Sequence, residues 1–156
     1  MSKMKNQKFY SFLFLVLILV FIVLEFNYLF IKSDLIWDAS VYIGMGKYIY
    51  SSGKSGLWES SRPLIWPLIV GFFWKINLDY IFWAKFITVL LGIGCIVLVY
   101  IISKEIFDNR IGFYTALFFA MSPTFFLFGN IPLSDIPSTF FFIVGNIFFC
   151  SKKAQA

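Results

Sequence analysis

The sequence predicts an all-α, polytopic helical membrane protein with about four transmembrane helices and interfacial helices in the first outer loop. Hydrophobic residues make up 60% of the chain and aromatic residues 22%, whereas charged residues make up only 13%, against roughly 25% in soluble domains. The 13 lysines and arginines are scattered in ones and twos among long apolar runs. This pattern is typical of membrane flanks and argues against a nucleic-acid-binding surface.

The first span is predicted at about residues 9–31, after a segment that carries Lys3, Lys5 and Lys8. A helix of about 23 residues is about 35 Å long, which is enough to cross a hydrocarbon core of about 30 Å. A cleaved signal peptide is the alternative, but its apolar region would be only about 7–15 residues long and would end at a small-residue cleavage site. The sequence has no convincing site of this kind, so we expect an uncleaved anchor with its N-terminus inside. Glu25, near the outer end of this span, is expected to be structural or to snorkel.

The outer loop, residues 32–79, holds the acids, cations and glycines that the apolar runs lack. Apolar residues at helical spacing predict a short helix over residues 39–50, which Asp38 can cap. Residues 51–61 contain two glycines and five serines and read as a loop. The apolar run at residues 64–76 would form a helix of only about 20 Å, which is too short to span, so an interfacial or re-entrant helix is expected.

Three further spans are predicted at about residues 80–102, 111–128 and 136–150. The third is expected to bend or end near Pro123, because proline interrupts the helical hydrogen-bond ladder. Cys95 and Cys150 fall in apolar segments and read as small buried side chains, so they indicate no redox compartment.

The distribution of basic residues selects the topology. If residues 64–76 do not cross, seven basic residues lie inside and five outside. If they do cross, four of the inner ones move outside. The positive-inside rule therefore favours four spans with both ends cytoplasmic, and it places the loop at 32–79 and the turn at 129–135 on the same outer face.

Several charged residues collect on that outer side. The sequence has no histidine, so a general base or metal ligand would most readily be a carboxylate. Lys85 lies about one and a half turns into the second span from the outer side. The others lie in or beside the outer segments: Asp38, Glu59, Arg62, Asp79 and Asp135.

The order of these features resembles the first outer loop of the GT-C glycosyltransferases, and most nearly the protein O-mannosyltransferase and aminoarabinose transferase group with its prokaryotic relatives. An acid follows the first span, then come a tyrosine-bearing helix, a glycine loop and an R-P-x-x-x-P segment that leads a short apolar helix. The matching pieces are WDASVY at 37–42, RPLIWP at 62–67, Lys85, Met121-Ser122-Pro123 and Leu133-Ser134-Asp135. The resemblance covers nearly the whole chain, and its specificity lies in the order and topology of loose motifs.

The resemblance implies a polyprenyl-phosphate sugar donor, an acceptor hydroxyl on a protein, lipid or glycan, and transfer with inversion at the anomeric carbon. It also implies a multi-pass protein of the prokaryotic plasma membrane with its active site extracytoplasmic. Family members are much longer, so residues 1–156 correspond to an N-terminal transmembrane module. No cofactor is certain and a divalent metal is left open, because Ala39 and Ser61 stand where many relatives carry additional acids.

The chemistry of such a transfer assigns roles to the outer residues. A carboxylate must take the hydroxyl proton, and cations must stabilise the departing phosphate. Asp38 is the predicted base, which the resemblance also implies, and Arg62 and Lys85 are the predicted phosphate-binding cations. The remaining candidates are Asp135 and Glu59 for a second acidic site facing acceptor or metal, and Tyr42 and Trp66 for contact with sugar or acceptor.

Each of these residues also has a plain structural interpretation. Asp38 and Asp135 can cap helices, and Arg62 can anchor the chain among lipid headgroups. Lys85 can snorkel to the outer interface, and Tyr42 and Trp66 can belong to an aromatic belt.

Two other classes of function compete with a transferase. A non-catalytic small membrane interaction or assembly subunit would need no grouping of acids with cations and would tolerate changes at Asp38 and Arg62. A transporter or channel would place polar residues near the bilayer midplane, whereas here only Asn146 and small residues lie deep.

Overall fold

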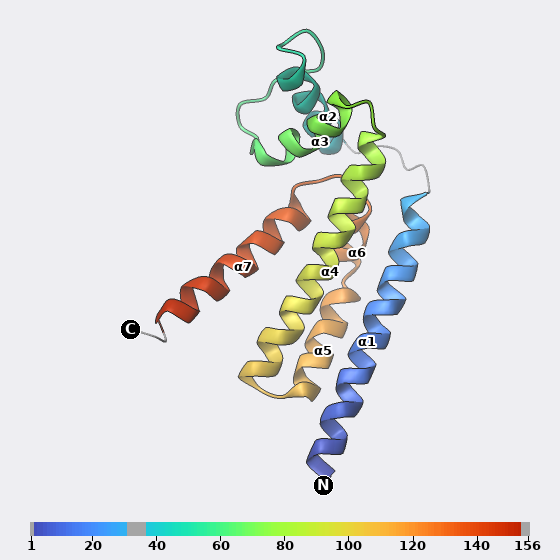
Figure 1. The fold of residues 1–156 in the computed structure, drawn as a ribbon, viewed down its shortest axis with the longest axis vertical. Coiled ribbons are helices and arrows are strands. Elements are labelled where there is room, and N and C mark those ends of the chain that lie inside the picture. The colour runs from blue at the N-terminus through green and yellow to red at the C-terminus, as the bar shows by residue number, and fades with distance from the viewer. Residues whose placement is uncertain (1, 31–36, 154–156) are drawn as a thin grey trace.

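In the computed structural model, described for residues 2–30 and 37–153 and for the side chains of 7–30 and 37–147, every regular element is an α-helix (Figure 1). This confirms the predicted all-α class. The helices are α1 (Ser2–Leu29), α2 (Trp37–Tyr50), α3 (Ile65–Lys75), α4 (Tyr80–Ile106), α5 (Asn109–Ala120), α6 (Pro123–Gly129) and α7 (Asp135–Lys153). The first residues of the predicted outer loop, 32–36, lie outside the described part of the chain.

The long helices alternate in direction, and α2 and α3 form a separate layer at one end of them (Figure 1). Within the described residues, α1 over Gln7–Leu29 and α4 over Tyr80–Ile106 are long and apolar enough to cross a membrane. The α5–α6 pair meets the same test as one bent segment, and the apolar part of α7, Asp135–Ile147, is shorter. The helical membrane architecture is therefore confirmed, while the four-span topology stays a prediction.

The third predicted span bends where the sequence indicated. Helix α5 ends at Ala120 and α6 begins at Pro123, and the two axes differ by 63°. Proline fits the first position of α6 because that position has no intrahelical partner for an amide hydrogen. The amide of Phe126 donates to the Ser122 carbonyl at 3.0 Å, so the ladder resumes directly after the break.

Aromatic stacking joins α1 to α4 in the core of the bundle. The ring of Phe14 lies parallel to that of Tyr100, with centroids 3.8 Å apart, and the Tyr100 hydroxyl lies 3.3 Å from Ser11 Oγ. Cys95 is fully buried in the same core, as predicted, whereas the side chain of Cys150 lies outside the described part. The bundle of long helices is thus held mainly by apolar packing, with a few polar contacts between helices.

We call the layer formed by α2 and α3 the outer layer, after its predicted side of the membrane. It contains the two short helices that the sequence predicted, but their ends differ from the predicted ones. Helix α2 starts at Trp37, so Asp38 lies in its first turn and is not the residue before the helix. Helix α3 has 11 residues and spans only about 16 Å, which is shorter than a hydrocarbon core of about 30 Å and fits the expected interfacial helix. Pro67 lies in its first turn, where proline is tolerated, and Pro63 precedes the N-cap Leu64 and is outside the helix.

Two glycines let α2 and α3 cross closely. A Cβ atom on Gly46 would lie 2.7 Å from the Pro67 carbonyl oxygen, and one on Gly71 would lie 2.6 Å from the Gly46 carbonyl oxygen. Real Cβ atoms do not come this close to backbone atoms. The contact between the two helices therefore depends on the absence of side chains at both positions.

The outer layer rests on the start of α4. Asp79 caps this helix by accepting hydrogen bonds from the amides of Ile81 and Phe82, both at 3.1 Å. Lys47 on α2 donates to the Tyr80 hydroxyl at 3.1 Å and lies 4.7 Å from the centre of its ring. These contacts fix the outer layer at the end of the long helices.

Candidate functional site

Arg62 joins two carboxylates that come from different parts of the outer loop. Its Nη2 donates to Asp38 Oδ1 in a short ion pair, and its Nε donates to Glu59 Oε1 at 3.3 Å. The Ser61 hydroxyl donates to the same Glu59 oxygen at 2.9 Å. The Asp38 side chain remains 47% exposed, so a soluble molecule can still reach its carboxylate.

The guanidinium of Arg62 also lies over the ring of Tyr42, 5.4 Å from its centre. The hydrogen bond to Asp38, supported by Tyr42, holds the pKa of the Arg62 guanidinium above its usual range. Arg62 is therefore cationic at every physiological pH. We call this group, Asp38, Tyr42, Glu59 and Arg62, the Arg62 cluster.

Hydrogen bonds from the outer layer reach the connection between α6 and α7. The hydroxyl of Tyr42 lies 2.8 Å from Ser134 Oγ, and Trp66 Nε1 donates to the Pro132 carbonyl at 2.9 Å. The outer loop and the 129–135 turn, which the charge pattern placed on one face, are thus in direct contact. Ser134 received no role from the sequence, although it lies inside one of the motifs that carry the resemblance.

Lys85 lies beneath this outer layer on α4. It is 3% exposed, and the preceding residue, Ala84, belongs to the same packed cluster as Tyr42 and Trp66. Because the side chain is covered by protein, the snorkelling interpretation does not describe this structure. Its position beside the outer layer is compatible with the predicted phosphate-binding role, which stays a prediction.

The two aromatic candidates are buried. Tyr42 is 5% exposed and Trp66 is 2% exposed, so neither belongs to an aromatic belt at the membrane surface. In this conformation Trp66 acts as a packing residue whose indole is satisfied by backbone, while Tyr42 supports Arg62. Contact of either ring with a sugar or acceptor stays a prediction.

Asp135 is exposed as the first residue of α7. Its carboxylate makes no hydrogen bond or ion pair with another described residue, so the helix-capping interpretation finds no support in a side-chain contact. No three acidic, cysteine or histidine side chains in the described ranges come together in a group that can hold a metal ion. A metal-binding role for Asp135 and Glu59 therefore stays untested.

Glu25 on α1 and Asn130 after α6 form a buried polar pair, of which the sequence analysis identified only Glu25. Glu25 is fully buried, and its Oε2 accepts a hydrogen bond from Asn130 Nδ2 at 2.6 Å. Glu25 is therefore structural and does not snorkel. A carboxylate inside an apolar span demands a polar partner at the same depth, and this rule points to Asn130 at the outer end of the third span.

Residues 61–155, more than half of the chain, match the family described as dolichyl-phosphate-mannose-protein mannosyltransferase. The chain belongs to this family. The match makes it a membrane mannosyltransferase-type glycosyltransferase. No curated protein and no solved structure matches the chain.

The region matched to the mannosyltransferase family begins just before Arg62 and includes Lys85 and Ser134. Asp38 and Tyr42 lie N-terminal to it. The ion pair of Asp38 with Arg62 and the hydrogen bond of Tyr42 with Ser134 attach these residues to the matched region. The candidate site is therefore continuous across the N-terminal boundary of the family match.

Proposed function

We propose that this chain carries the catalytic outer loop of an inverting membrane glycosyltransferase. It would move a sugar from a polyprenyl-phosphate donor to a hydroxyl of a protein, lipid or glycan, on the extracytoplasmic face of a prokaryotic plasma membrane. Family membership supports sugar transfer. The observation that carries the proposal is the Arg62 cluster, which holds a reachable carboxylate beside a permanent cation at the outer end of the helices.

The reaction needs one bond to form as another breaks. The acceptor oxygen attacks the anomeric carbon from the face opposite the phosphate, and its proton passes to the Asp38 carboxylate. The bond between the anomeric carbon and the phosphate oxygen breaks, and its electron pair leaves with the phosphate. Attack from the opposite face inverts the configuration of the sugar.

The cations have separate tasks in this scheme. Arg62 orients Asp38 in the resting state through their ion pair, and it shares with Lys85 the stabilisation of the departing phosphate. Lys85 suits the phosphate because it lies inside the span, below the loop that bears the base. Glu59 orients Arg62 through its hydrogen bond, and Asp135 is left to face the acceptor or a metal ion.

The Asp38→Asn variant tests the base. Asparagine preserves the shape of the side chain and can still accept a hydrogen bond from Arg62, but it cannot take a proton. We expect turnover to fall by about 10²-fold or more while donor binding is retained. The measurement is transfer of labelled mannose from polyprenyl-phosphate mannose in proteoliposomes, with donor binding measured separately.

The matched control is Asp108→Asn, an acid before α5 at the other end of the bundle, whose carboxylate accepts a hydrogen bond from the Ile111 amide at 2.8 Å. Asparagine caps helices about as well as aspartate, so α5 and the activity should be unaffected. Equal turnover in Asp38→Asn and wild type would show that Asp38 is not the base that takes the acceptor proton. Absence of transfer in the wild type, with both variants fully assembled, would instead favour a non-catalytic membrane assembly subunit.

A further inference from the structure

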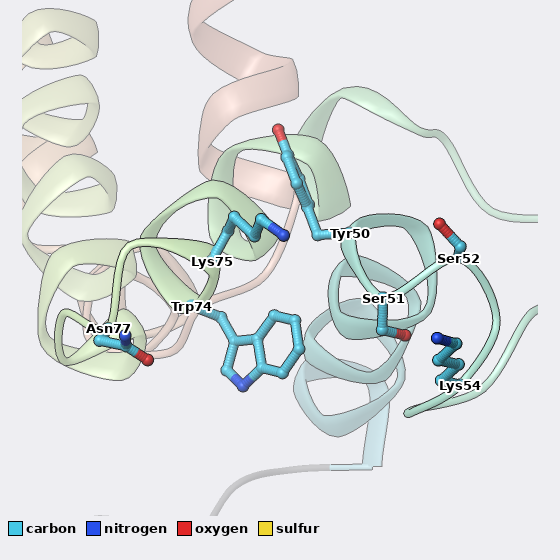
Figure 2. A pocket seen from close by; sticks show the side chains of 7 residues that line it. All are labelled: Tyr50, Ser51, Ser52, Lys54, Trp74, Lys75 and Asn77. Atoms are coloured by element: carbon cyan, nitrogen blue, oxygen red, sulfur yellow. The ribbon is translucent and has the colours of Figure 1, made fainter.

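A hollow lies at the opposite end of α2 from Asp38. It has a volume of about 460 Å³, within the roughly 300–1,000 Å³ of small-molecule sites. Figure 2 shows its lining, which comes from the end of α2 with the following turn and from the end of α3: Tyr50, Ser51, Ser52, Lys54, Trp74, Lys75 and Asn77. It is separate from the Arg62 cluster, since the 13 residues from Asp38 to Ser51 span about 20 Å of helix.

The charge of this hollow is entirely positive. Lys54 and Lys75 approach it from different elements, and no acidic residue lines it (Figure 2). Both lysines are exposed, and neither ammonium group makes an ion pair or a side-chain hydrogen bond with another described residue. Two ammonium groups from separate segments thus face one cavity.

Capping of the neighbouring helix ends does not explain the lysines. Carbonyls in the last turns of α2 and α3 accept from backbone amides: Gly53 N donates to Tyr48 O at 2.9 Å, and Asn77 N donates to Trp74 O at 3.1 Å. Within the described residues, neither lysine ammonium donates to a carbonyl of these turns. Ser52 and Asn77 take positive φ angles of 54° and 57° in these turns, as residues that follow a helix often do. Both lysine ammonium groups are therefore accessible to a ligand in the hollow.

The uncharged lining suits a hydroxylated ring. Trp74 and Tyr50 are half-buried and supply aromatic surface, on which the C–H face of a sugar can lie. The side chains of Ser52 and Asn77 make no hydrogen bond with another described residue, so both can bond ring hydroxyls. Cations, aromatic surface and free polar side chains together define the class of ligand.

We propose that this hollow is a binding site for a sugar that carries an oxyanion, either a phosphate or a carboxylate. The two lysines bind the oxyanion through charge-assisted hydrogen bonds, and Trp74 carries the ring. Such a group can come from a soluble or glycan-borne sugar or from the headgroup of an anionic lipid. The site does not depend on Asp38, so its test is independent of sugar transfer.

The experiment follows the fluorine NMR signal of 5-fluorotryptophan in the whole chain, with Trp74→Phe used to assign the Trp74 resonance. The probes are glucose 6-phosphate and, as the neutral control, glucose. We expect a saturable shift of the Trp74 signal with glucose 6-phosphate and none with glucose. The Lys54→Ala/Lys75→Ala double variant should bind about tenfold more weakly or worse, since both charge-assisted contacts are lost.

Two further variants make the result specific. The Lys54→Arg/Lys75→Arg variant keeps both charges and should retain binding, which separates loss of charge from misfolding. Lys8→Ala removes an exposed lysine from the far end of α1 and should leave binding unchanged. A second arm compares nanodiscs of phosphatidylglycerol with nanodiscs of phosphatidylcholine, without added sugar.

A shift of Trp74 with glucose 6-phosphate would identify a sugar outside the bilayer as the ligand. A shift in the phosphatidylglycerol nanodiscs alone would overturn the proposal in favour of a lipid phosphate, because that headgroup carries an oxyanion without a sugar ring. The proposal is overturned if neither probe moves the signal. It is equally overturned if glucose acts as strongly as its phosphate, or if the alanine double variant binds like wild type.

Discussion

Arg62 is the residue on which the outer contacts converge. One side chain binds Asp38 and Glu59 and lies over Tyr42, so three separate positions depend on its planar guanidinium. A lysine at this position would carry the same charge but could not reproduce the fixed fork of donors or the stacking on a ring. The contacts of the Arg62 cluster therefore require the planar shape of arginine as well as its positive charge.

Glu25 is the second residue with consequences beyond its own position. Its Oε1 and the Oδ1 of Asn130 are both buried without a hydrogen-bond partner among the described residues. Glutamine at position 25 would still accept from Asn130 and would add an N–H group able to donate to that oxygen. We expect Glu25→Gln to be at least as stable as wild type, whereas Glu25→Ala should lose about 1–3 kcal/mol because Asn130 is left unsatisfied.

Unfolding in detergent by titration with a denaturing surfactant, followed by circular dichroism, measures this difference. If Glu25→Gln were as unstable as Glu25→Ala, the carboxylate itself would be required, and the hydrogen-bonding account of this pair would be wrong. The control is Glu105→Gln, because Glu105 is exposed and its side chain makes no hydrogen bond or ion pair with another described residue.

At the scale of elements, the crossing of α2 and α3 is the most demanding contact. Gly71→Ala would drive a methyl group into the Gly46 backbone, so we expect a loss of about 1–3 kcal/mol through overpacking and separation of the two helices. Gly145→Ala on α7 is the matched control, because a Cβ atom there meets nothing within 4 Å. Thermal unfolding monitored by tryptophan fluorescence compares the two.

Equal melting temperatures for the two alanine variants would show that the outer layer is not held at this crossing. If the prediction is right, Gly71→Ala should also disturb the Arg62 cluster, since α2 carries Asp38 and α3 follows Arg62 directly in the chain. Sugar transfer would then fall together with stability, in contrast to Asp38→Asn, which should affect transfer alone.

The sequence predicted the positions of the helices better than it predicted the side-chain contacts between them. Apolar run lengths gave the start of α4 at Tyr80 and the break near Pro123, because span length and proline geometry are local properties. The predicted helix at 39–50 begins two residues after the observed start of α2, because an acid before an apolar run predicts a cap, whereas the Asp38 carboxylate binds Arg62. Local capping signals cannot reveal a partner that lies 24 residues further along the chain.

The candidate site was predictable in its composition and less so in its geometry. The charge pattern placed the two outer segments on one face, but the contacts between them, Tyr42 with Ser134 and Trp66 with Pro132, depend on tertiary packing. The same packing buries Trp66, although an aromatic belt at the membrane surface is one interpretation of its place in the sequence. Burial is decided by neighbours from elsewhere in the chain, so a single sequence carries little signal for it.

At the scale of the whole molecule, topology is the open prediction. A single cysteine at Ser55 or at Glu105, in a background with Cys95→Ala and Cys150→Ala, reports the side of the membrane. We expect an impermeant maleimide to label the Ser55 site in intact cells and the Glu105 site only after permeabilisation. Glu105 is suited to labelling because it is exposed near the α4–α5 turn. Asn109, on the other side of this turn, is less suitable, because it is 8% exposed and donates a hydrogen bond to the Gln7 carbonyl at 3.1 Å.

Labelling of the Glu105 site in intact cells would contradict the four-span arrangement and would place the α4–α5 turn outside. The prediction rests on the positive-inside rule together with the alternating directions of the long helices (Figure 1). An outer location of Ser55 would also place the oxyanion-binding hollow and the Arg62 cluster in the same compartment.

The hydrogen bond between Tyr42 and Ser134 also bears on the order of events during biosynthesis, because 92 residues of sequence separate its partners. At roughly 5–20 residues per second, the ribosome needs on the order of several seconds to extend the chain from α3 to Ser134. Throughout this interval α2 and α3 have already been translated, but the segment that covers Tyr42 and Trp66 has not. The nascent outer layer is therefore exposed to chaperones and proteases until the chain beyond α6 has been made, and the candidate site is among the last parts of this region to be completed.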